Sequence, residues 1–328
     1  WSAQIIRGPL THHVRFAPSA RPATQTAAHY VSFYAVLHWY GDRRGPLQRP
    51  TDWLDRYFNS SEIHLISALN LDDPLAPKQA PEDPSITTGQ TFAIYLIKNN
   101  IKVNGLVLRK KAPSDAYDVA SEYSKSIAQI IEDMLIISNN QDSEILARVS
   151  SSIALNNPST NAATDLVLKD VEKLGISSVD NALSDTSGLS RSNKISPSDF
   201  SELIYKSVHQ PEVSIQAEGD DSKFLIKPKN SIPSDTWPVF TGLPTGHGLG
   251  TMEKRFDEDK SPGRGVVRAK TGTLNQVITL AGTITTKDQA FLSFAILVNR
   301  VEKPNQVREA LDNLLNEIAK CNCAIQNE

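Results

Sequence analysis

One short stretch of the sequence combines residue types that can bind an anion. Lys270 is followed directly by Thr271, Gly272 and Thr273, inside the strand-like run GVVRAKTGTLNQV of residues 265–277. Small residues leave open space beside a strand, and the lysine ammonium and threonine hydroxyls can donate hydrogen bonds to a carboxylate. The pattern therefore predicts a strand that receives an anionic ligand. A solvated lysine near a strand end is the alternative interpretation.

A second stretch offers groups that can relay a proton and hold a carbonyl. Ser138, Asn139 and Asn140 lie between two apolar patterns typical of helices. A serine hydroxyl both donates and accepts hydrogen bonds, and an asparagine amide can bind a carbonyl oxygen. Both residue types also cap helices, so Ser138 and Asn140 could serve that purpose as well. Because Ser138 and Lys270 are 132 residues apart, only the fold can join them.

The elements that must position these residues have clear periodicities. Apolar residues recur at helical spacing before Ser138, and SEILARVSSSIAL resumes a helical pattern after Asn140. The runs VITLAGTITT and AFLSFAILVN predict two strands joined by a turn, and a helix is expected to begin near Pro304. Inward positions of the two outer helices are predicted to be Ile127, Ile130, Ile131, Met134 and Leu135, and Val307, Leu311, Leu314, Leu315 and Ile318. An antiparallel meander backed by a terminal helix is the predicted architecture.

Upstream of residue 114 the pattern is less regular. Residues 51–113 predict a small α+β region, with strands in EIHLISALN and KVNGLVLRKK around a helix in TTGQTFAIYLIKNNI. Residues 1–50 mix arginine, proline and aromatic residues, and only ATQTAAHYVSFYAVL resembles a helix. The histidines of this region, His12, His13, His29 and His38, have no spacing typical of a metal site.

Composition excludes several classes of protein. The net charge of −3 over 328 residues does not favour nucleic-acid binding, and no apolar run approaches the length of a membrane span. Cys321 and Cys323 form a C-x-C pair that supplies two metal ligands, too few for a zinc site, so a disulfide or two free thiols is expected. The chain starts with Trp1 and no export signal, which suggests a trimmed precursor or a start inside a longer protein.

Several blocks, taken in order, resemble one enzyme family. VVRAKTGTLNQVITLAGTITT resembles the third motif of penicillin-binding enzymes, K-T-G on a sheet-edge strand. The stretches IIEDMLIISNNQDSEILAR, SDTSGLSRSNKISP and LPTGHGLGTMEKRF resemble the helix–S-x-N–helix, D-G-S-G-L-S-R and G-x-x-G-T-L-x-x-R-F blocks of the penicillin-binding-protein-4 type. The chain is thus similar, over residues 51–323, to D-alanyl-D-alanine carboxypeptidases/endopeptidases of peptidase family S13. Thr186 stands where that family commonly has glycine.

The resemblance implies an α+β fold: a penicillin-binding/β-lactamase-like transpeptidase domain, an antiparallel sheet flanked by helices, plus the remainder of a smaller inserted α+β domain. Residues 1–113 would be what remains of the inserted domains, and residues 114–328 the C-terminal part of the catalytic domain. It implies catalytic roles for Ser138, Asn140 and Lys270, and substrate binding by Thr271, Gly272 and Thr273. Asp185 and Ser187 are expected as structural turn residues beside the cleft, and His247 as loop surface.

The family's chemistry also needs a nucleophile that the sequence does not supply. A serine three residues before a lysine would place both on one helix face, yet no lysine of this chain has serine at that position. Ser19 in APSARPA is a poor substitute, because Pro22 stands where the lysine belongs. We therefore expect a fragment or truncated product that lacks the Ser-x-x-Lys segment and is inactive alone.

Three functional hypotheses follow. The first is a serine-type D-Ala-D-Ala carboxypeptidase that acts on peptidoglycan stem peptides through an acyl-enzyme and binds β-lactams as substrate mimics. The second is a non-catalytic envelope protein that retains a peptide-binding cleft. A β-lactamase is less favoured, because those enzymes lack the inserted domains that residues 51–113 resemble. No cofactor and no metal are expected, and the substrate of the family implies a location in the cell envelope, outside the cytoplasmic membrane.

Overall fold

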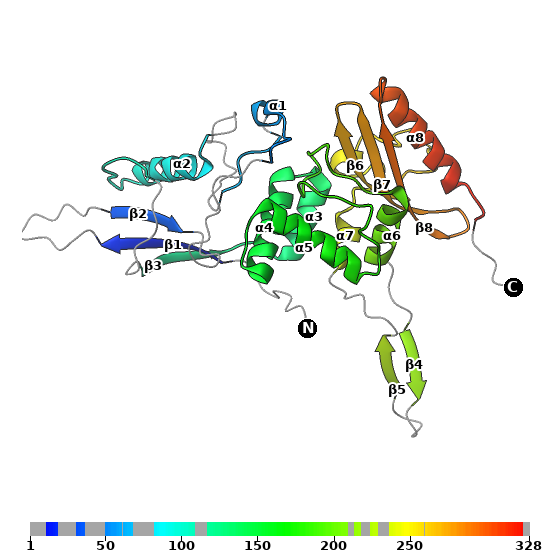
Figure 1. The fold of residues 1–328 in the computed structure, drawn as a ribbon, viewed down its shortest axis with the longest axis horizontal. Helices are drawn as coiled ribbons and strands as arrows, with labels where there is room; N and C mark the ends of the chain where they lie inside the picture. Colours follow the sequence, from blue (N-terminus) through cyan, green and yellow to red (C-terminus); the bar gives the residue numbers. More distant parts are fainter. Residues whose placement is uncertain are drawn as a thin grey trace, which may run out of the picture. The chain divides into compact units, whose positions relative to one another are not determined.

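The structure is a computed structural model that describes residues 11–18, 31–36, 50–60, 62–67, 82–108, 117–208, 213–217, 224–228, 236–258 and 260–323 (Figure 1). Contacts divide the chain into two compact units. Unit 1 comprises Trp1–Ile127, Asn140–Leu166 and Ser184–Ser192, and unit 2 comprises Ala128–Asn139, Val167–Leu183 and Asn193–Glu328. The units are interleaved along the sequence, and the division at residue 113 into inserted and catalytic domains stays a prediction.

Unit 2 is built on a three-stranded antiparallel meander, as predicted. Its strands β6 (Val267–Leu274), β7 (Val277–Thr285) and β8 (Phe291–Asn299) lie in the order β6-β7-β8 (Figure 1). Only two residues join β6 to β7, and the register pairs Lys270 with Ala281 and Leu274 with Val277. The K-T-G segment therefore lies on an edge strand, whose outer side has backbone groups left over for a further partner.

Helix α8 (Pro304–Ala319) packs its apolar stripe on this sheet. Leu311 and Leu315 are buried there together with Val267 and Ala269 of β6. Leu314, predicted to face inward, is 48% exposed. The buried positions of α8 are spaced four residues apart, and a helix turns about 100° per residue, so Leu314 lies well to the side of Leu315.

The remaining helices of unit 2 lie around the same sheet. Helix α6 (Pro197–Val208) packs against β7 and β8. Helix α3 (Ile127–Ile137) contacts α7 (Trp237–Gly242) at Gly242, where a Cβ would come within 2.8 Å of the Cα of Glu132. Strands β4 (Val213–Ala217) and β5 (Phe224–Pro228) form a separate hairpin.

Unit 1 contains two helices that the sequence predicted, α2 (Pro84–Lys98) and α4 (Asn140–Leu155), and a sheet that the sequence did not indicate. Helix α1 (Asp55–Asn59) and the first half of α5 (Thr160–Lys173) also belong to it. Gly175, with φ +78°, follows the end of α5 in the left-handed conformation that is typical of a glycine cap. The sheet has the order β2-β1-β3, from Val31–Val36, Thr11–Pro18 and Tyr117–Tyr123.

Three local predictions were wrong. Residues 31–36, predicted as part of a helix, form β2, because the β-branched and aromatic residues of VSFYAV pair with a neighbouring strand. The described part of EIHLISALN has only an isolated bridge position at Ile66, and residues 101–108 have no strand. Short apolar runs become strands only where a partner strand exists.

The structure also bears on the predictions about cysteines, membrane spans and metal sites. Cys321 and Cys323 form a disulfide, one of the two states expected. Ser19, His29 and His38 lie outside the described residues. Within the described parts of the chain, no helix has the length and apolar character that crossing a membrane requires. No group of three or more histidine, cysteine, aspartate or glutamate residues in those parts could hold a metal ion.

With α helices against an antiparallel sheet, the predicted α+β class is confirmed.

Candidate functional site

The fold brings together the two residues that the sequence placed 132 positions apart. The Nζ of Lys270, on β6, donates a hydrogen bond to the Oγ of Ser138, just past the end of α3, at 2.6 Å. A second bond runs from the same ammonium to the backbone carbonyl of Thr271, at 2.9 Å. Both side chains belong to unit 2, and both are partly buried. The pair thus joins a fixed cation to a hydroxyl at one edge of the sheet.

Ser138 owes its position to the way α3 ends. The N–H of Asn139 donates to the carbonyl of Met134 at 2.9 Å, and Ser138 between them has φ +61°. This is the Schellman arrangement, in which the residue after the helix is left-handed and is usually glycine. A serine there costs about 1–3 kcal/mol in backbone strain. The left-handed conformation places the hydroxyl at the end of the helix, where it contacts Lys270.

The strain leads to a first prediction, for Ser138→Gly. We expect the free energy of unfolding to stay unchanged or to rise by up to about 1 kcal/mol, because glycine adopts φ +61° without penalty. Urea unfolding followed by circular dichroism measures this.

The matched control is Arg300→Gly, which replaces another left-handed residue (φ +58°) away from the site. If Ser138→Gly were destabilising while Arg300→Gly was not, the hydrogen bond to Lys270 would outweigh the strain.

A tight turn after α7 fixes the distance between α3 and β6. The carbonyl of Pro244 accepts from the N–H of Ala269 at 2.9 Å, and the N–H of Gly246 donates to the carbonyl of Val267 at 2.8 Å. Further on, Gly250 has φ +68°, and a Cβ on it would lie 2.1 Å from the carbonyl oxygen of Ile136. The turn therefore touches both elements that carry the site. Sequence reasoning missed this role, although the glycines of LPTGHGLG were its visible signal.

His247, in the same turn, differs from its expected place on the loop surface. It is partly buried, and its Nδ1 atom is buried without a hydrogen-bond partner among the described residues.

The outer edge of β6 exposes backbone groups beside Lys270. Since the N–H of Ala269 and the carbonyl of Val267 point away from β7, the alternation of an antiparallel strand directs those of Thr271 and Thr273 the same way. Gly272 keeps β6 close to β7, because a Cβ there would lie 2.2 Å from the Oγ1 of Thr279. An extended peptide could pair with this edge.

The threonine side chains lie on a different face of β6 from the ammonium. Val267 and Ala269 pack toward α8, and alternation puts Thr271 and Thr273 on that side. The Oγ1 of Thr273 lies 3.5 Å from the Nη2 of Arg308 on α8. The hydroxyls therefore reach a ligand at the strand edge from the side opposite to Lys270, and their binding role stays a prediction.

Asn140, the third residue of the S-x-N stretch, belongs to unit 1. It is the first residue of α4, and its Nδ2 donates to the carbonyl of Glu62 at 3.0 Å. The structure therefore shows Asn140 tying the start of α4 to the segment after α1. Its catalytic role remains a prediction.

Unit 1 also contains a buried polar network that sequence reasoning only touched. Asp185, with no exposed surface, accepts hydrogen bonds from the Trp53 indole and from the N–H groups of Gly188 and Ser190. Glu144, 1% exposed, accepts the N–H groups of Thr186 and Ser187 at 2.8 Å. Asp185 is thus a structural turn residue, as expected. The sequence signal for this network, which was missed, is the acidic Glu144 followed one helical turn later by the basic Arg148.

Burial sets the electrostatics of Lys270. Removal of its ammonium from water lowers the pKa of Lys270 from 10.5 to about 8. At neutral pH the side chain is mostly charged and can attract a carboxylate, yet it gives up its proton far more readily than an exposed lysine. A hydroxyl in contact with such a group is well placed to pass protons.

The lowered pKa of Lys270 leads to a second prediction, for Lys270→Met. Below pH 8 the folded state retains the charge at a desolvation cost, whereas between about 8 and 10.5 the unfolded state binds more protons. The parent chain is therefore expected to gain stability relative to the variant as the pH rises through this window, by at most about 3 kcal/mol. Unfolding free energies measured from pH 7 to 10.5 test this.

Replacement of the exposed Lys254 by methionine is the matched control. A flat difference between parent and Lys270→Met would contradict the burial argument.

Comparison with known proteins shows similarity to a family of carboxypeptidases. The model of a family described as "D-Ala-D-Ala carboxypeptidase 3 (S13) family" matches residues 73–318. A carboxypeptidase of Mycobacterium tuberculosis is 27% identical over 287 residues, which cover 85% of this chain and 56% of that protein. The D-alanyl-D-alanine carboxypeptidase of an Actinomadura species is 25% identical, with 75% and 43% covered. The chain thus spans about half the length of the curated relatives it matches.

One solved structure is similar in both fold and sequence. Penicillin binding protein 4 of Haemophilus influenzae, in complex with a β-lactam, superposes with a TM-score of 0.58 at 25% identity. The alignment covers 74% of this chain and 53% of that one.

Proposed function

Because the chain belongs to the D-Ala-D-Ala carboxypeptidase 3 (S13) family, we propose that its site receives peptidoglycan peptides that end in D-Ala-D-Ala. The 2.6 Å contact between Lys270 and Ser138 at the open edge of β6 is the observation that carries the proposal. The terminal carboxylate would lie near the ammonium of Lys270, and the peptide would pair with the backbone of Thr271 and Thr273. β-Lactams would enter the same site as mimics of this peptide end.

The geometry suits proton transfer to a leaving amine. Since the Oγ of Ser138 accepts a hydrogen bond from Lys270, its own proton is free to point elsewhere. In the acyl transfer that the family implies, a serine attacks the carbonyl of the penultimate D-Ala, the C–N bond breaks, and the terminal D-Ala departs. Ser138 would give its proton to that departing nitrogen and regain one from Lys270. The N–H of Thr273 would help stabilise the oxyanion.

The attacking serine has no candidate in this sequence. No lysine of the chain follows a serine at the spacing of a Ser-x-x-Lys motif. We therefore propose serine-type carboxypeptidase activity for a protein that includes such a motif, and peptide binding without turnover for the present chain. A non-catalytic envelope protein with a peptide-binding cleft is the second candidate, which the same absence favours. In either case the substrate implies a location outside the cytoplasmic membrane.

Calorimetric titration with a D-Ala-D-Ala tripeptide tests the binding proposal. We expect the free acid to bind, and its C-terminal amide to bind about tenfold to a hundredfold more weakly, since a charged hydrogen bond is lost. Lys270→Met should weaken binding of the acid by a similar factor, whereas Lys254→Met should not. Equal affinity for acid and amide would contradict the assignment of Lys270 as carboxylate anchor.

Labelling with a fluorescent penicillin separates binding from catalysis. We expect no covalent adduct on this chain after denaturing electrophoresis. A labelled band would show that a nucleophile exists here and would overturn the non-catalytic reading, while leaving the binding site intact.

A further inference from the structure

A cavity lies in unit 2, at the end of the sheet where β6 and β8 begin and β7 ends. Its volume is about 480 Å³, within the range of small-molecule sites. It is lined by residues of β6 to β8, of α7 and of the end of α8, including Arg268, Thr283, Lys287, Phe240, Phe291 and Lys320. Neither Ser138 nor Lys270 lines it. The cavity is therefore distinct from the site described above.

Two of its cations have no anionic partner. The guanidinium of Arg268 lies over the ring of Phe240 at 5.0 Å from the centroid, and it makes no hydrogen bond or ion pair with any described residue. Lys287 is exposed and likewise has no partner in the described part of the chain. The third cation, Lys320, pairs with Glu317 at 2.7 Å. Two positive charges are thus left to a ligand.

One carboxylate lies next to Lys287 along the chain and is not part of the cavity lining. Asp288 follows Lys287 directly, and it accepts a hydrogen bond from the Oγ1 of Thr286 at 2.5 Å.

A threonine of the middle strand lines the same cavity. Thr283 is only 1% exposed, and no side-chain hydrogen bond joins it to a residue that the structure describes. Its hydroxyl can therefore donate a hydrogen bond to a bound acceptor. Thr283 lies opposite Arg268 in the β6–β7 register, so the two side chains can contact the same anionic group of a ligand.

Part of the lining is aromatic. Phe240 and Phe291 pack edge to face with centroids 6.1 Å apart, and Trp237, outside the lining, adjoins Phe240 at 5.0 Å. Phe291 is 38% exposed. A ligand with an apolar body would cover it.

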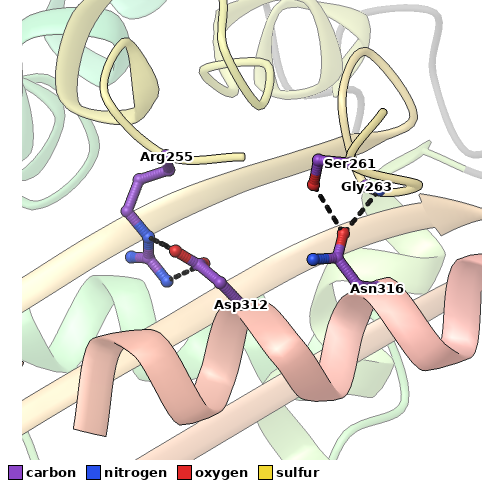
Figure 2. A network of polar contacts seen from close by, with 5 residues as sticks. All are labelled: Arg255, Ser261, Gly263, Asp312 and Asn316. Carbon is purple, nitrogen blue, oxygen red and sulfur yellow. Dashed lines mark hydrogen bonds and ion pairs between the residues drawn. The ribbon is translucent and has the colours of Figure 1, made fainter. Parts of the chain in front are cut away.

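The loop that contains Pro262 lines the cavity and is attached to α8. Figure 2 shows the polar contacts that attach it. Arg255 forms a bidentate ion pair with Asp312, and Asn316 accepts from the hydroxyl of Ser261 and the N–H of Gly263, both at 2.8 Å. These contacts flank Pro262, which lines the cavity. The cavity is therefore a preformed part of the fold.

We propose that this cavity binds a small organic anion that has an apolar, preferably aromatic, body. Its carboxylate or phosphate contacts Arg268, Lys287 and the hydroxyl of Thr283, and its apolar part lies against Phe240 and Phe291. The proposal does not depend on the function proposed for the Ser138–Lys270 site.

Calorimetric titration with defined probes tests the proposal, in the Lys270→Met chain so that the first site does not contribute. The probes are 4-phenylbutyrate, phenyl phosphate and the neutral 4-phenylbutanamide. We expect saturable one-to-one binding of at least one anion, and binding of the amide at least tenfold weaker. The preference between the two anions identifies carboxylate or phosphate as the natural group.

Variants assign the binding to the cavity. Arg268→Met should lower the affinity for the preferred anion about tenfold or more. Lys287→Met, at an exposed position that the fold does not require, should weaken it severalfold, and Lys254→Met should leave it unchanged. Binding of the amide as tight as that of the acid would overturn the proposal. So would the absence of saturation by either anion at millimolar concentration, or unchanged affinity in both Arg268→Met and Lys287→Met.

Discussion

Gly250→Ala is expected to lower the free energy of unfolding by about 2–4 kcal/mol and to weaken peptide binding at the Ser138–Lys270 site. Two effects add. Alanine at φ +68° is strained by about 1–2 kcal/mol, and its Cβ would lie 2.1 Å from the carbonyl oxygen of Ile136, a backbone atom that cannot rotate away. Relief of the clash must displace the last turn of α3. That turn ends at Ser138, so the contact with Lys270 would lengthen.

Gly265→Ala is the matched control for this prediction. Gly265 also has a left-handed φ, +76°, but a Cβ there would meet nothing within 4 Å. It should lose only the strain contribution, about 1–2 kcal/mol, and retain peptide binding. Urea unfolding and calorimetric titration of both variants measure the two effects. Equal losses in Gly250→Ala and Gly265→Ala would show that contact with α3 does not matter.

The second large effect is expected for Glu144→Ala, with a loss of about 3–5 kcal/mol in the free energy of unfolding. The substitution leaves the N–H groups of Thr186 and Ser187 without their acceptor. It also removes the negative charge that stabilises the cation of Arg148, itself only 7% exposed. The turn that contains Asp185 would lose its attachment to α4.

Glu144→Gln distinguishes the two causes. Burial raises the pKa of Glu144, with the charge of Asp185 adding to the effect, so the charged form is costly in the folded state. Glutamine keeps an oxygen for both N–H groups and removes that cost, and we expect a loss below about 2 kcal/mol. If glutamine were as damaging as alanine, the charge opposite Arg148 would be the dominant contribution.

Strong local periodicity made much of unit 2 predictable. The helix before Ser138, strands β7 and β8, and α8 all carry ten or so residues of consistent pattern, and each was found where the sequence placed it. The same applies to α2 and α4 in unit 1. Short segments were harder, because VSFYAV and KVNGLVLRKK look alike as apolar runs. The first pairs with a neighbouring strand, whereas the described part of the second, residues 102–108, has no strand.

The candidate site was likewise predictable from the sequence only in part. Residue types and order identified Lys270 and Ser138 as candidates. The resemblance to the S13 family predicted a shared catalytic role for them, and that role stays a prediction. The left-handed φ of Ser138, the contact of Gly250 with α3 and the orientation of the β6 backbone could not be read from spacing. Each depends on atoms contributed by segments far apart in sequence.

The sequence by itself determined which groups are present: an ammonium, a hydroxyl and a strand of small residues, but no Ser-x-x-Lys pair. The tertiary structure decided that the ammonium and the hydroxyl meet at 2.6 Å, and that Arg268, two residues before Lys270, lines a different cavity. The physical reason is that chemical identity is local to a residue. Distance, burial and the pKa that follows from burial arise only when remote segments pack together.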